Sequence, residues 1–434
     1  MVRGADRRSQ VVISGIGVVS PFGVGRERFW DGISNGHSGI RIISDFDTSK
    51  LPCCVAAQVP AIGIGDSLPV EGEQVDDSKR AGRRRSRADP RRYSKASLIG
   101  VIAAREAWRD SGLRVGETGA GVIVGSGAGG VDVAEREYAE FFVGDWKRVA
   151  PYAIPVSIVG MVSSEISIAL QLRGISHVIS TGCTSSTDAI GYGAGMIRSG
   201  EAEVLLAGGV DACVTQGMML GFSKMRAMPT HFNTKPTEAS RPFDQNREGF
   251  VLGEGAWMVV LEREDRALAR GAHRYVTVEG YGSTCDAYHR VQMDPAGEEI
   301  VGAMKLALDR AGRSIGELGY VNFHGTSTML NDAIESKCVR RLLQRYADRV
   351  PGSSTKSMIG HPQGASGAAG IVTTALAMSR RFLPPTINQQ TPDPECDLDF
   401  IPNRGRVAEP NVALCNCLGF GSKNSAIVLG AVGS

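Results

Sequence analysis

The chain has 434 residues, of which 42% are hydrophobic and 22% charged, and its formal net charge is +2. A chain of this length exceeds a single hydrophobic core, so we expect two domains or one duplicated fold. The small net charge gives no argument for a nucleic-acid or membrane partner, and no apolar run reaches the roughly 18 residues that cross a bilayer. Nine scattered cysteines without metal-ligand spacing favour a reducing, cytoplasmic setting and no metal site.

The first half alternates predicted strands and helices. Apolar runs predict strands over Val11–Val19, Gly121–Gly125 and Val204–Asp211, and helical periodicity predicts a helix over Ser97–Trp108. Between the first strand and that helix, the region from Pro60 to Arg92 is typical of a loop, because it is rich in Pro, Gly, Asp and Arg.

The second half repeats this alternation. We expect a strand over Tyr275–Gly280, a helix over Glu298–Ala311 and a strand over Tyr320–Phe323. A small-residue helix then covers Gly364–Ser379, and Val412–Gly430 forms two strands joined through Gly-Phe-Gly. Strands that alternate with helices predict an α/β fold with largely buried sheets, one in each half.

Cys183 is the first candidate for chemistry. It lies in the run from His177 to Gly191, where an apolar stretch breaks at Thr-Gly and small residues follow. This pattern predicts a buried strand, a tight turn and a helix that begins near the cysteine. A thiol at a helix N-terminus has its pKa lowered from about 8.5, which makes it a nucleophile. The alternative is a cysteine that fills space in the core, and we favour that role for the other eight.

Two histidines are candidate partners for Cys183. His324 directly follows the predicted strand Tyr320–Phe323, and ligand-facing groups in α/β folds gather at such carboxyl ends. His361 lies in a glycine-flanked loop ahead of the Gly364–Ser379 helix. Each imidazole alone could be a hydrogen-bonded structural group, but two of them together with a poised cysteine indicate an active site.

Three motifs resemble the Cys-His-His signature of β-ketoacyl-ACP synthases, in particular the elongating, synthase-II-like branch. They are Thr181-Gly-Cys183, His324-Gly-Thr-Ser-Thr328 and Lys356-Ser-Met-Ile-Gly-His361, supported by the long block Arg241–Gly255. Further segments are similar to the ketosynthase (KS alpha) subunits of bacterial type II polyketide synthases: Ser180–Ser185, Cys285–His289 and Asp393–Phe400. The His-Gly-Thr-Ser-Thr form is closer to the fatty-acid elongating enzymes.

The resemblance implies a thiolase-type fold, in which two duplicated α/β halves form a five-layered α-β-α-β-α arrangement. Residues 10–266 would form the half that carries Cys183, and residues 267–434 the half that carries both histidines. The family is usually dimeric. We therefore expect a homodimer, or a heterodimer with a chain-length-factor-like subunit.

The resemblance also implies a decarboxylative Claisen condensation. Cys183 would take the acyl chain from a carrier-protein thioester, and malonyl-ACP would then lose CO2. Neutral Nε2–H groups of His324 and His361 would stabilise the enolate oxygen. The backbone N–H groups of Cys183 and Phe420 would hold the oxyanion that forms when the carbanion attacks the thioester.

Further roles follow from the family on matching positions. Lys356 would hold the histidine and water network, and Glu335 with Asp332 would orient it. Ordinary alternatives are a surface lysine and solvated helix carboxylates.

The substrate would arrive on the phosphopantetheine arm of acyl carrier protein, and we expect no tightly bound cofactor. Thr326 and Thr328 would hydrogen-bond the amides of that arm. Phe420, between two glycines, would be a gate that admits malonyl after acylation, although it could also be a plain core aromatic.

A strongly basic segment, Lys79–Lys95, contains nine Lys or Arg in seventeen residues. Such runs are usually solvated loops. Because carrier proteins are acidic, docking of the carrier is a hypothesis for this segment, whereas nucleic acid is disfavoured by the lack of interleaved aromatics.

Three competing functions remain open. A fatty-acid elongating synthase II would carry out the same reaction on a different chain. A thiolase shares the fold, its histidine loop resembles the segment around His361, and Cys417 lies near the position of its second cysteine. However, thiolases do not decarboxylate, and the His324 block belongs to the condensing enzymes. A non-catalytic chain-length-factor-like subunit would lack the nucleophile, and the presence of Cys183 argues against it.

Overall fold

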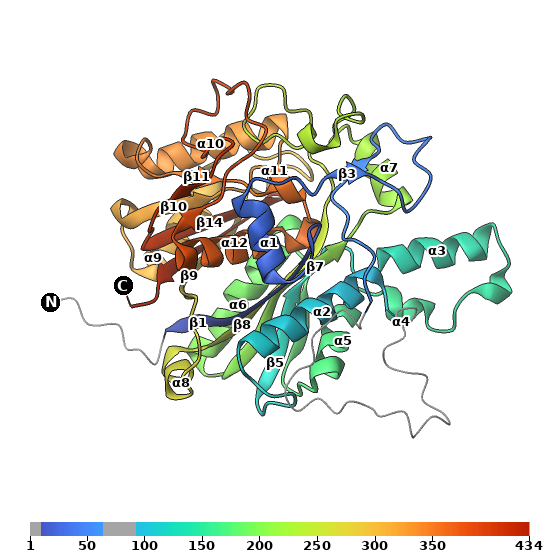
Figure 1. Cartoon of the computed structure of the whole chain (residues 1–434), viewed down its shortest axis with the longest axis horizontal. Coiled ribbons are helices and arrows are strands. Elements are labelled where there is room, and N and C mark those ends of the chain that lie inside the picture. The colour runs from blue at the N-terminus through green and yellow to red at the C-terminus, as the bar shows by residue number, and fades with distance from the viewer. Residues whose placement is uncertain (1–9, 64–92, 434) are drawn as a thin grey trace.

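A long mixed β-sheet runs through the molecule. The structure is a computed structural model that describes residues 10–63 and 93–433. In this part of the chain, eleven strands form one sheet, in the order β11-β10-β14-β15-β9-β1-β8-β7-β5-β6 with β2 paired to β1. Figure 1 shows these strands with helices packed around them.

The main elements of the first half are β1 (Val11–Ser20), α2 (Lys95–Asp110), β5 (Ala120–Gly125), α5 (Met161–Leu170), β6 (Ser176–Ile179), α6 (Ser185–Ser199), β7 (Val204–Ala212) and β8 (Glu254–Arg263). Those of the second half are β9 (Val276–Cys285), α9 (Glu298–Ala311), β10 (Leu318–Asn322), α10 (Met329–Leu343), β11 (Gly352–Ser353), α12 (Ser366–Arg380), β14 (Val412–Gly419) and β15 (Lys423–Ala431). The smaller elements are β2 (Gly23–Val24), α1 (Arg26–Ser34), β3 (Arg41–Ile42), β4 (Val55–Ala56), α3 (Val131–Phe142), α4 (Ala153–Ser157), α7 (Gln216–Lys224), α8 (Glu264–Ala269), α11 (Lys356–Ile359), β12 (Phe382–Leu383) and β13 (Arg406–Val407).

The two halves share one strand pattern. In the first half, β1, β8 and β7 pair antiparallel in turn, and β7, β5 and β6 pair parallel. In the second half, β9, β15 and β14 pair antiparallel, and β14, β10 and β11 pair parallel. The helices fall at matching places in the chain order, so α2 corresponds to α9, α5 to α10 and α6 to α12. The two parts of the chain therefore share one order of strands and helices.

The expectation of a separate sheet in each half is wrong in one respect. The strands Val11–Ile13 and Val276–Val278 pair antiparallel, and this short contact joins the two sets of strands into one hydrogen-bonded sheet. Each half is otherwise paired within itself.

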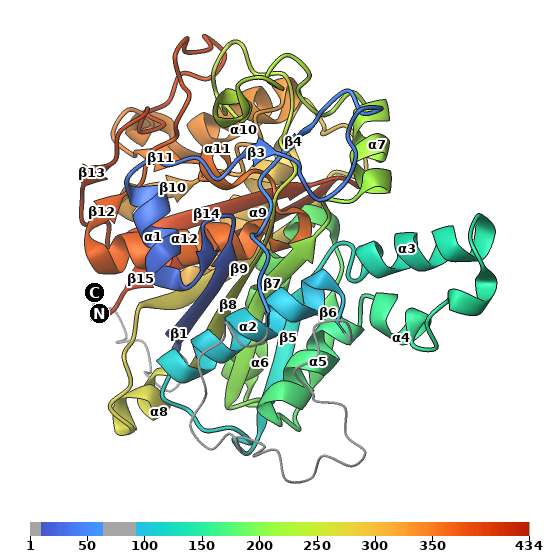
Figure 2. The same cartoon turned by 45° about the vertical axis from the view of Figure 1, so that its right-hand side comes forward.

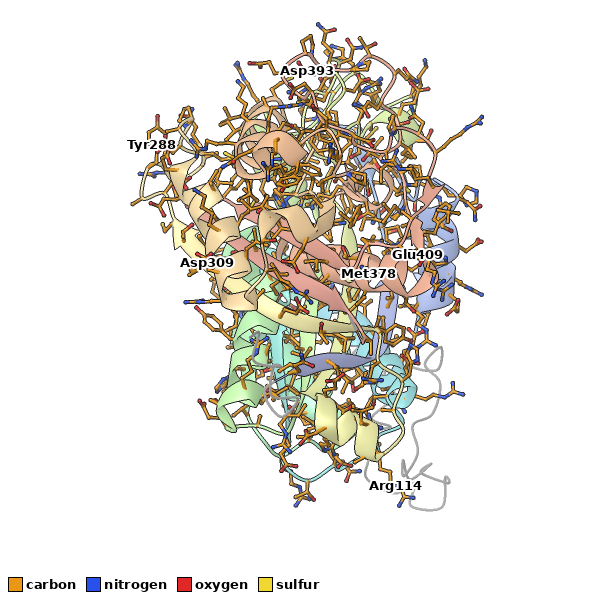
Figure 3. All side chains as sticks on the ribbon, turned by 90° about the vertical axis from the view of Figure 1, so that its left-hand side faces the viewer. Arg114, Tyr288, Asp309, Met378, Asp393 and Glu409 are labelled. Carbon is orange, nitrogen blue, oxygen red and sulfur yellow. The ribbon has the colours of Figure 1, made fainter. Side chains whose placement is uncertain are left out.

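Helices α6 and α12 pack against each other in the middle of the molecule (Figures 1 and 2). Small residues allow the approach: the Ala368 N–H donates to the Ser186 hydroxyl at 2.8 Å, and a Cβ on Gly367 would lie 1.9 Å from Oγ1 of Thr187. Figure 3 shows Met378 of α12 at mid-height, between Asp393 at one end and Arg114 at the other. Cys183 lies just before the N-terminus of α6, and His361 lies five residues before α12 begins.

Most predicted elements are confirmed to within a few residues. The predicted Ser97–Trp108 helix is α2, the Glu298–Ala311 helix is α9, and the two strands of the last segment are β14 and β15. Strand β6 is a correction, because it was expected to be buried. It lies at the edge of the sheet, and both Ser176 and His177 are exposed in the single chain.

The hairpin of α3 and α4 projects from the body of the first half (Figure 2). It exposes several large apolar side chains, among them Tyr138, Phe141, Phe142, Trp146 and Tyr152. Among the helices that the structure describes, none is both long and apolar enough to span a membrane.

Candidate active site

Cys183 lies at the junction of β6 and α6. The chain leaves β6, turns at Gly182 with φ of +69°, and enters a 3-10 turn, Gly182–Thr184, that leads into α6. The left-handed φ explains why a glycine precedes the cysteine. Asp188, one turn into α6, accepts hydrogen bonds from the Thr181 hydroxyl at 2.5 Å and the Thr184 hydroxyl at 3.1 Å. The carboxylate therefore fixes the residues on both sides of Cys183.

The expected low pKa of the Cys183 thiol is not found. Only 6% of the residue is exposed, and burial raises the pKa of the thiol to about 11. The Phe420 N–H and the positive charge of Lys356 act in the opposite direction but do not outweigh burial. Helix α6 begins only at Ser185, after the 3-10 turn, so Cys183 itself lies outside the helix. At neutral pH Cys183 is therefore mainly a neutral thiol.

His324 follows β10 and is held through its backbone. The N–H groups of His324 and Gly325 donate to the two carboxylate oxygens of Glu335 at 2.7 and 2.8 Å. Asn416 and Asn331 donate to the same carboxylate at 2.7 and 3.3 Å. Glu335 thus positions the His324 turn. Burial raises the pKa of Glu335 to about 7.

His361 is held through its ring. Its Nδ1 accepts a hydrogen bond from the Gln363 backbone N–H at 3.1 Å and lies 2.9 Å from the Ser366 hydroxyl. Because a backbone amide can only donate, Nδ1 carries the lone pair and the neutral ring carries its proton on Nε2. The Phe250 ring packs edge-on at 5.3 Å between centroids. The expected Nε2–H donor therefore fits this geometry at His361.

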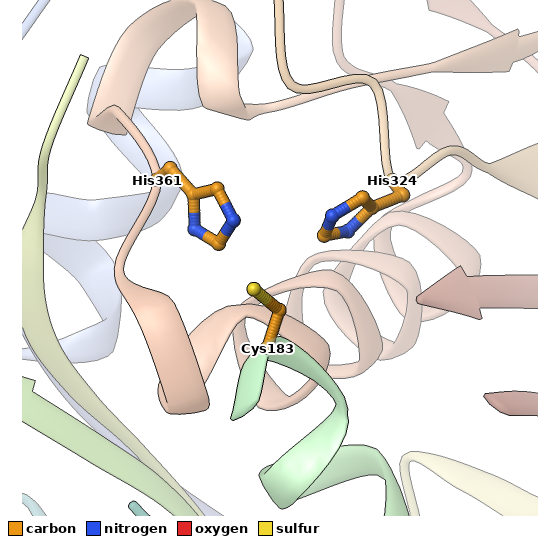
Figure 4. A group of neighbouring side chains, drawn as sticks. All are labelled: Cys183, His324 and His361. Carbon is orange, nitrogen blue, oxygen red and sulfur yellow. The ribbon is translucent and has the colours of Figure 1, made fainter. Parts of the chain in front are cut away.

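The sulfur of Cys183 and one nitrogen of each imidazole lie within 4.8 Å of one another, and the side chains point toward a common space (Figure 4). The two rings are 5.3 Å apart and nearly perpendicular. Burial, with the nearby charge of Lys356, lowers the pKa of both histidines well below 6.5, so both are neutral at pH 7. Such a trio could hold a soft metal ion. However, the proton on Nε2 of His361 occupies the lone pair that a metal would need.

Two backbone N–H groups point at the Cys183 sulfur, those of Phe420 and of Cys183 itself. Phe420 reaches this place because the end of β14 packs against the 3-10 turn, where a Cβ on Gly419 would lie 3.3 Å from the Cys183 nitrogen. Donors at this position can stabilise an oxyanion on a thioester carbon bonded to the sulfur.

Lys356 and Asp332 lie behind the two histidines, away from the cavity. Both are buried, Lys356 at the start of α11 and Asp332 in the first turn of α10. Burial lowers the pKa of the Lys356 ammonium, although the thiols of Cys417 and Cys183 and the carboxyl of Glu335 favour its charged form. Asp332 accepts N–H groups of Phe243 and Ser327 at 3.0 and 3.1 Å, so it holds the turn after His324.

A cavity of about 280 Å³ leads to the three residues. Thr326 and Thr328 line it, and their hydroxyls are 2.9 Å apart. Phe420 also lines it and is 38% exposed, so its ring is not a core aromatic. The remaining wall is mainly apolar and includes Met225, Phe250, Met293, Met329, Leu330 and Leu418. This shape suits a slender arm with a few amide groups better than a bulky polar ligand.

Comparison with known proteins identifies the family. Residues 8–267 match the beta-ketoacyl synthase N-terminal domain, and residues 275–390 match the beta-ketoacyl synthase C-terminal domain. The chain belongs to the β-ketoacyl synthase family. The predicted acyltransferase of the β-ketoacyl-ACP synthase type is thereby confirmed, and its Cys-His-His group is present in the fold.

Similar proteins of two kinds match this β-ketoacyl synthase over its full length. The 3-oxoacyl-[acyl-carrier-protein] synthase 2 of Coxiella burnetii is 38% identical, with 98% of this chain and 99% of the relative covered. The tetracenomycin polyketide synthase ketoacyl synthase alpha subunit of Streptomyces glaucescens is also 38% identical, with 99% and 98% covered. The solved ishigamide ketosynthase/chain length factor matches with a TM-score of 0.87 at 32% identity, with 98% of this chain and 99% of that chain covered.

Two positions in this β-ketoacyl synthase were not predicted to take part in the site. Asp211, at the end of β7, accepts the Gly364 N–H at 2.6 Å and so contacts the loop of His361. Cys417, on β14, lies 3.6 Å from Nδ1 of His324. The sequence signal for Asp211 is an aspartate at the end of a buried strand. The one sequence signal for Cys417 is its position near the second cysteine of thiolases.

Proposed function

We propose that the chain condenses malonyl-ACP with an acyl chain held as a thioester on Cys183, with loss of CO2. The observation that carries the proposal is the convergence on one buried sulfur of two backbone N–H donors and two neutral imidazoles. A hydrolase would need water at this site, whereas most of the cavity wall is apolar.

In the first step the Cys183 sulfur attacks the thioester carbonyl of an acyl-ACP. The new bond joins the sulfur to the acyl carbon, the bond to the pantetheine sulfur breaks, and the thiol proton ends on the departing sulfur. The N–H groups of Cys183 and Phe420 support the oxyanion during this exchange.

In the second step malonyl-ACP occupies the cavity and loses CO2. The electron pair of the broken C–C bond becomes an enolate, whose oxygen faces the two histidines, and the Nε2–H of His361 is aimed as its donor. The enolate carbon then attacks the Cys183 thioester, and the sulfur leaves as a thiolate. The thiolate takes up one proton from solvent, which is the proton that the overall reaction consumes. The product is a β-ketoacyl-ACP two carbons longer.

Lys356, Glu335 and Asp332 support the histidines by charge and by backbone hydrogen bonds. Thr326 and Thr328 line the cavity where the amides of the pantetheine arm would pass, and Phe420 serves as the gate between the acyl-transfer and condensation steps. No tightly bound cofactor takes part in these steps.

The proposal extends to the fold and its partners. The five-layered thiolase-type arrangement, with residues 10–266 and 267–434 as its halves, is supported by the repeated strand pattern.

The exposed edge strand β6 and the apolar hairpin of α3 and α4 favour a dimer, with a second copy or with a chain-length-factor-like subunit. Native mass of the chain alone, and after co-expression with such a subunit, would distinguish the two assemblies.

Carrier protein is the proposed macromolecular partner. The basic segment Lys79–Lys95 lies outside the described residues except for its last three, so its docking role stays a prediction. Lys95 itself forms an ion pair of 2.6 Å with the buried carboxylate of Glu254 and is not available for docking.

Nine free thiols are in keeping with a cytoplasmic protein.

We favour a type II polyketide ketosynthase, with fatty-acid elongation as the alternative. Two solved ketosynthases support the preference, the ishigamide ketosynthase/chain length factor and AntDE:AntF, which is described as a type II PKS acyl-carrier protein in complex with its ketosynthase. The equal identity to the Coxiella and Streptomyces relatives supports both pathways. Product analysis decides: a poly-β-ketone in the presence of a chain-length-factor-like subunit indicates polyketide synthesis, and a single condensation indicates elongation.

Intact mass spectrometry after incubation with acyl-ACP tests the central claim. We expect one acyl adduct on the wild-type chain and on Cys285→Ala, a matched control at an exposed thiol, and none on Cys183→Ala. Loss of malonyl-ACP decarboxylation in His324→Ala and His361→Ala would support the second step. An adduct that persists in Cys183→Ala would overturn the mechanism.

A further inference from the structure

A second thiol lies inside the site. Cys417 is 2% exposed and lies on β14, three residues before Phe420. Its sulfur is 3.2 Å from the backbone carbonyl oxygen of Cys183 and 3.6 Å from Nδ1 of His324. One side chain therefore contacts both the nucleophile's backbone and an imidazole ring.

The Cys417 thiol has one proton, so it can donate a hydrogen bond in only one of its two contacts. The Cys183 carbonyl can only accept, and a sulfur lone pair held 3.2 Å from it would be repelled. The S–H therefore points at the carbonyl, and the sulfur is left to accept a hydrogen bond from Nδ1 of His324. Nδ1 then carries the ring proton, and Nε2 carries the lone pair.

The two histidines consequently differ. His361 keeps its proton on Nε2, because the Gln363 N–H occupies Nδ1. His324 presents a bare Nε2 in the same space, where the Cys183 sulfur lies within 4.8 Å of both rings. One imidazole is a hydrogen-bond donor and the other is a base.

We propose that Cys417 is a positioning residue that holds His324 as its Nδ1–H tautomer, so that Nε2 takes the proton of Cys183 when the acyl chain is loaded. This inference rests on the proposed function and revises the sequence-based expectation that both rings present Nε2–H. The proton moves from the Cys183 sulfur to Nε2, and the thiolate forms its bond to the acyl carbon. As the pantetheine C–S bond breaks, the departing sulfur takes the proton from Nε2, so no other reactant is needed.

Several titratable groups surround this relay and will shape its pH dependence. These groups come from several elements: Cys183 in the 3-10 turn, His361 before α12, Lys356 on α11, Glu335 and Asp332 on α10, Asp188 on α6 and Asp211 on β7. The Lys356 ammonium opposes protonation of His324, so the imidazolium exists only during the transfer.

Single-turnover acylation followed by mass spectrometry tests the relay, with malonyl-ACP decarboxylation measured in parallel. In Cys417→Ala the tautomer is no longer held, and we expect acylation to slow by about tenfold while decarboxylation changes less. Cys417→Ser, whose hydroxyl can make the same two contacts, should restore acylation. Cys415→Ala is the matched control, because this thiol lies on the same strand but faces Thr374 at 3.2 Å. Equal rates for Cys417→Ala and Cys415→Ala would overturn the proposal.

Neutron diffraction from a deuterated crystal provides a test that does not depend on a variant. We expect the deuteron of His324 on Nδ1 and that of His361 on Nε2. A deuteron on Nε2 of His324 would contradict the inference even if every variant folds. Failure of the proposed function has a different signature, since the wild-type chain would then form no acyl adduct at all.

Discussion

The carboxylate of Asp211, at the end of β7, accepts the backbone N–H of Gly364 at 2.6 Å and thereby joins the two halves of the chain beside His361. The same carboxylate accepts the Ser126 hydroxyl and the Gly127 N–H, each at 2.8 Å. On the other side of the site, the end of β14 meets the turn of Cys183. Each half therefore contributes a strand end that supports the reactive residue of the other.

Asp211→Asn should impair the His361 loop more than the nucleophile. The amide replaces one acceptor oxygen with an NH2 group, which then faces backbone N–H donors, so we expect a loss of about 1–3 kcal/mol in unfolding free energy. Decarboxylation of malonyl-ACP should fall more than acylation of Cys183. Urea unfolding and the two half-reactions measure this, with Asp309→Asn, on the exposed face of α9, as the control. Equal losses in both half-reactions would contradict it.

Glu335→Gln should flatten the pH dependence of stability. Burial raises the pKa of Glu335 from 4.5 to about 7 in the folded chain. The native state then binds this proton more tightly than the unfolded state, so stability falls as pH rises from about 4.5 to about 7. The glutamine side chain does not bind this proton. The free energy of unfolding of the variant should therefore decline less over the same pH range, by up to about 3 kcal/mol. Unfolding titrations of both proteins at pH 5 and pH 8 check this, and parallel slopes would refute it.

The alkylation rate of Cys183 should keep rising well above neutral pH. With a pKa of about 11, the thiolate fraction grows about tenfold for each pH unit between 7 and 10. Iodoacetamide labelling, read by peptide mass spectrometry, gives the profile, and Cys183→Ala gives the background from the other thiols. A plateau near pH 7 would show that the helix terminus dominates over burial.

Gly367→Ala should destabilise the contact between the two central helices. The added methyl carbon would lie 1.9 Å from Oγ1 of Thr187, so α6 and α12 must move apart. We expect about 1–3 kcal/mol of destabilisation from this overpacking. Gly195→Ala is the control on α6, because nothing lies within 4 Å of its Cβ. That substitution should stabilise the helix by up to about 1 kcal/mol. Thermal melts of both variants measure this difference in stability. An equal loss of stability in the two variants would contradict the prediction.

Much of the secondary structure follows from local pattern. The apolar runs of β1 and β7 and the periodicity of α9 depend on neighbours in sequence, and their predicted bounds agree with the structure to within one residue. The exposure of β6 was not predicted, because its apolar residues Val178 and Ile179 are equally typical of a core strand. Its place at the sheet edge depends on which strands pair beyond β5.

The amino-acid sequence by itself determined the chemistry: a cysteine after a strand, two histidines in glycine-rich turns, and motifs that assign the chain to the β-ketoacyl synthases. The protonation states were decided only by tertiary structure, because they depend on burial and on the contacts that each side chain makes in the fold. Burial makes Cys183 a neutral thiol, and the Gln363 amide places the proton of His361 on Nε2. The contact of Cys417 with His324 joins residues 93 positions apart, which no local pattern records.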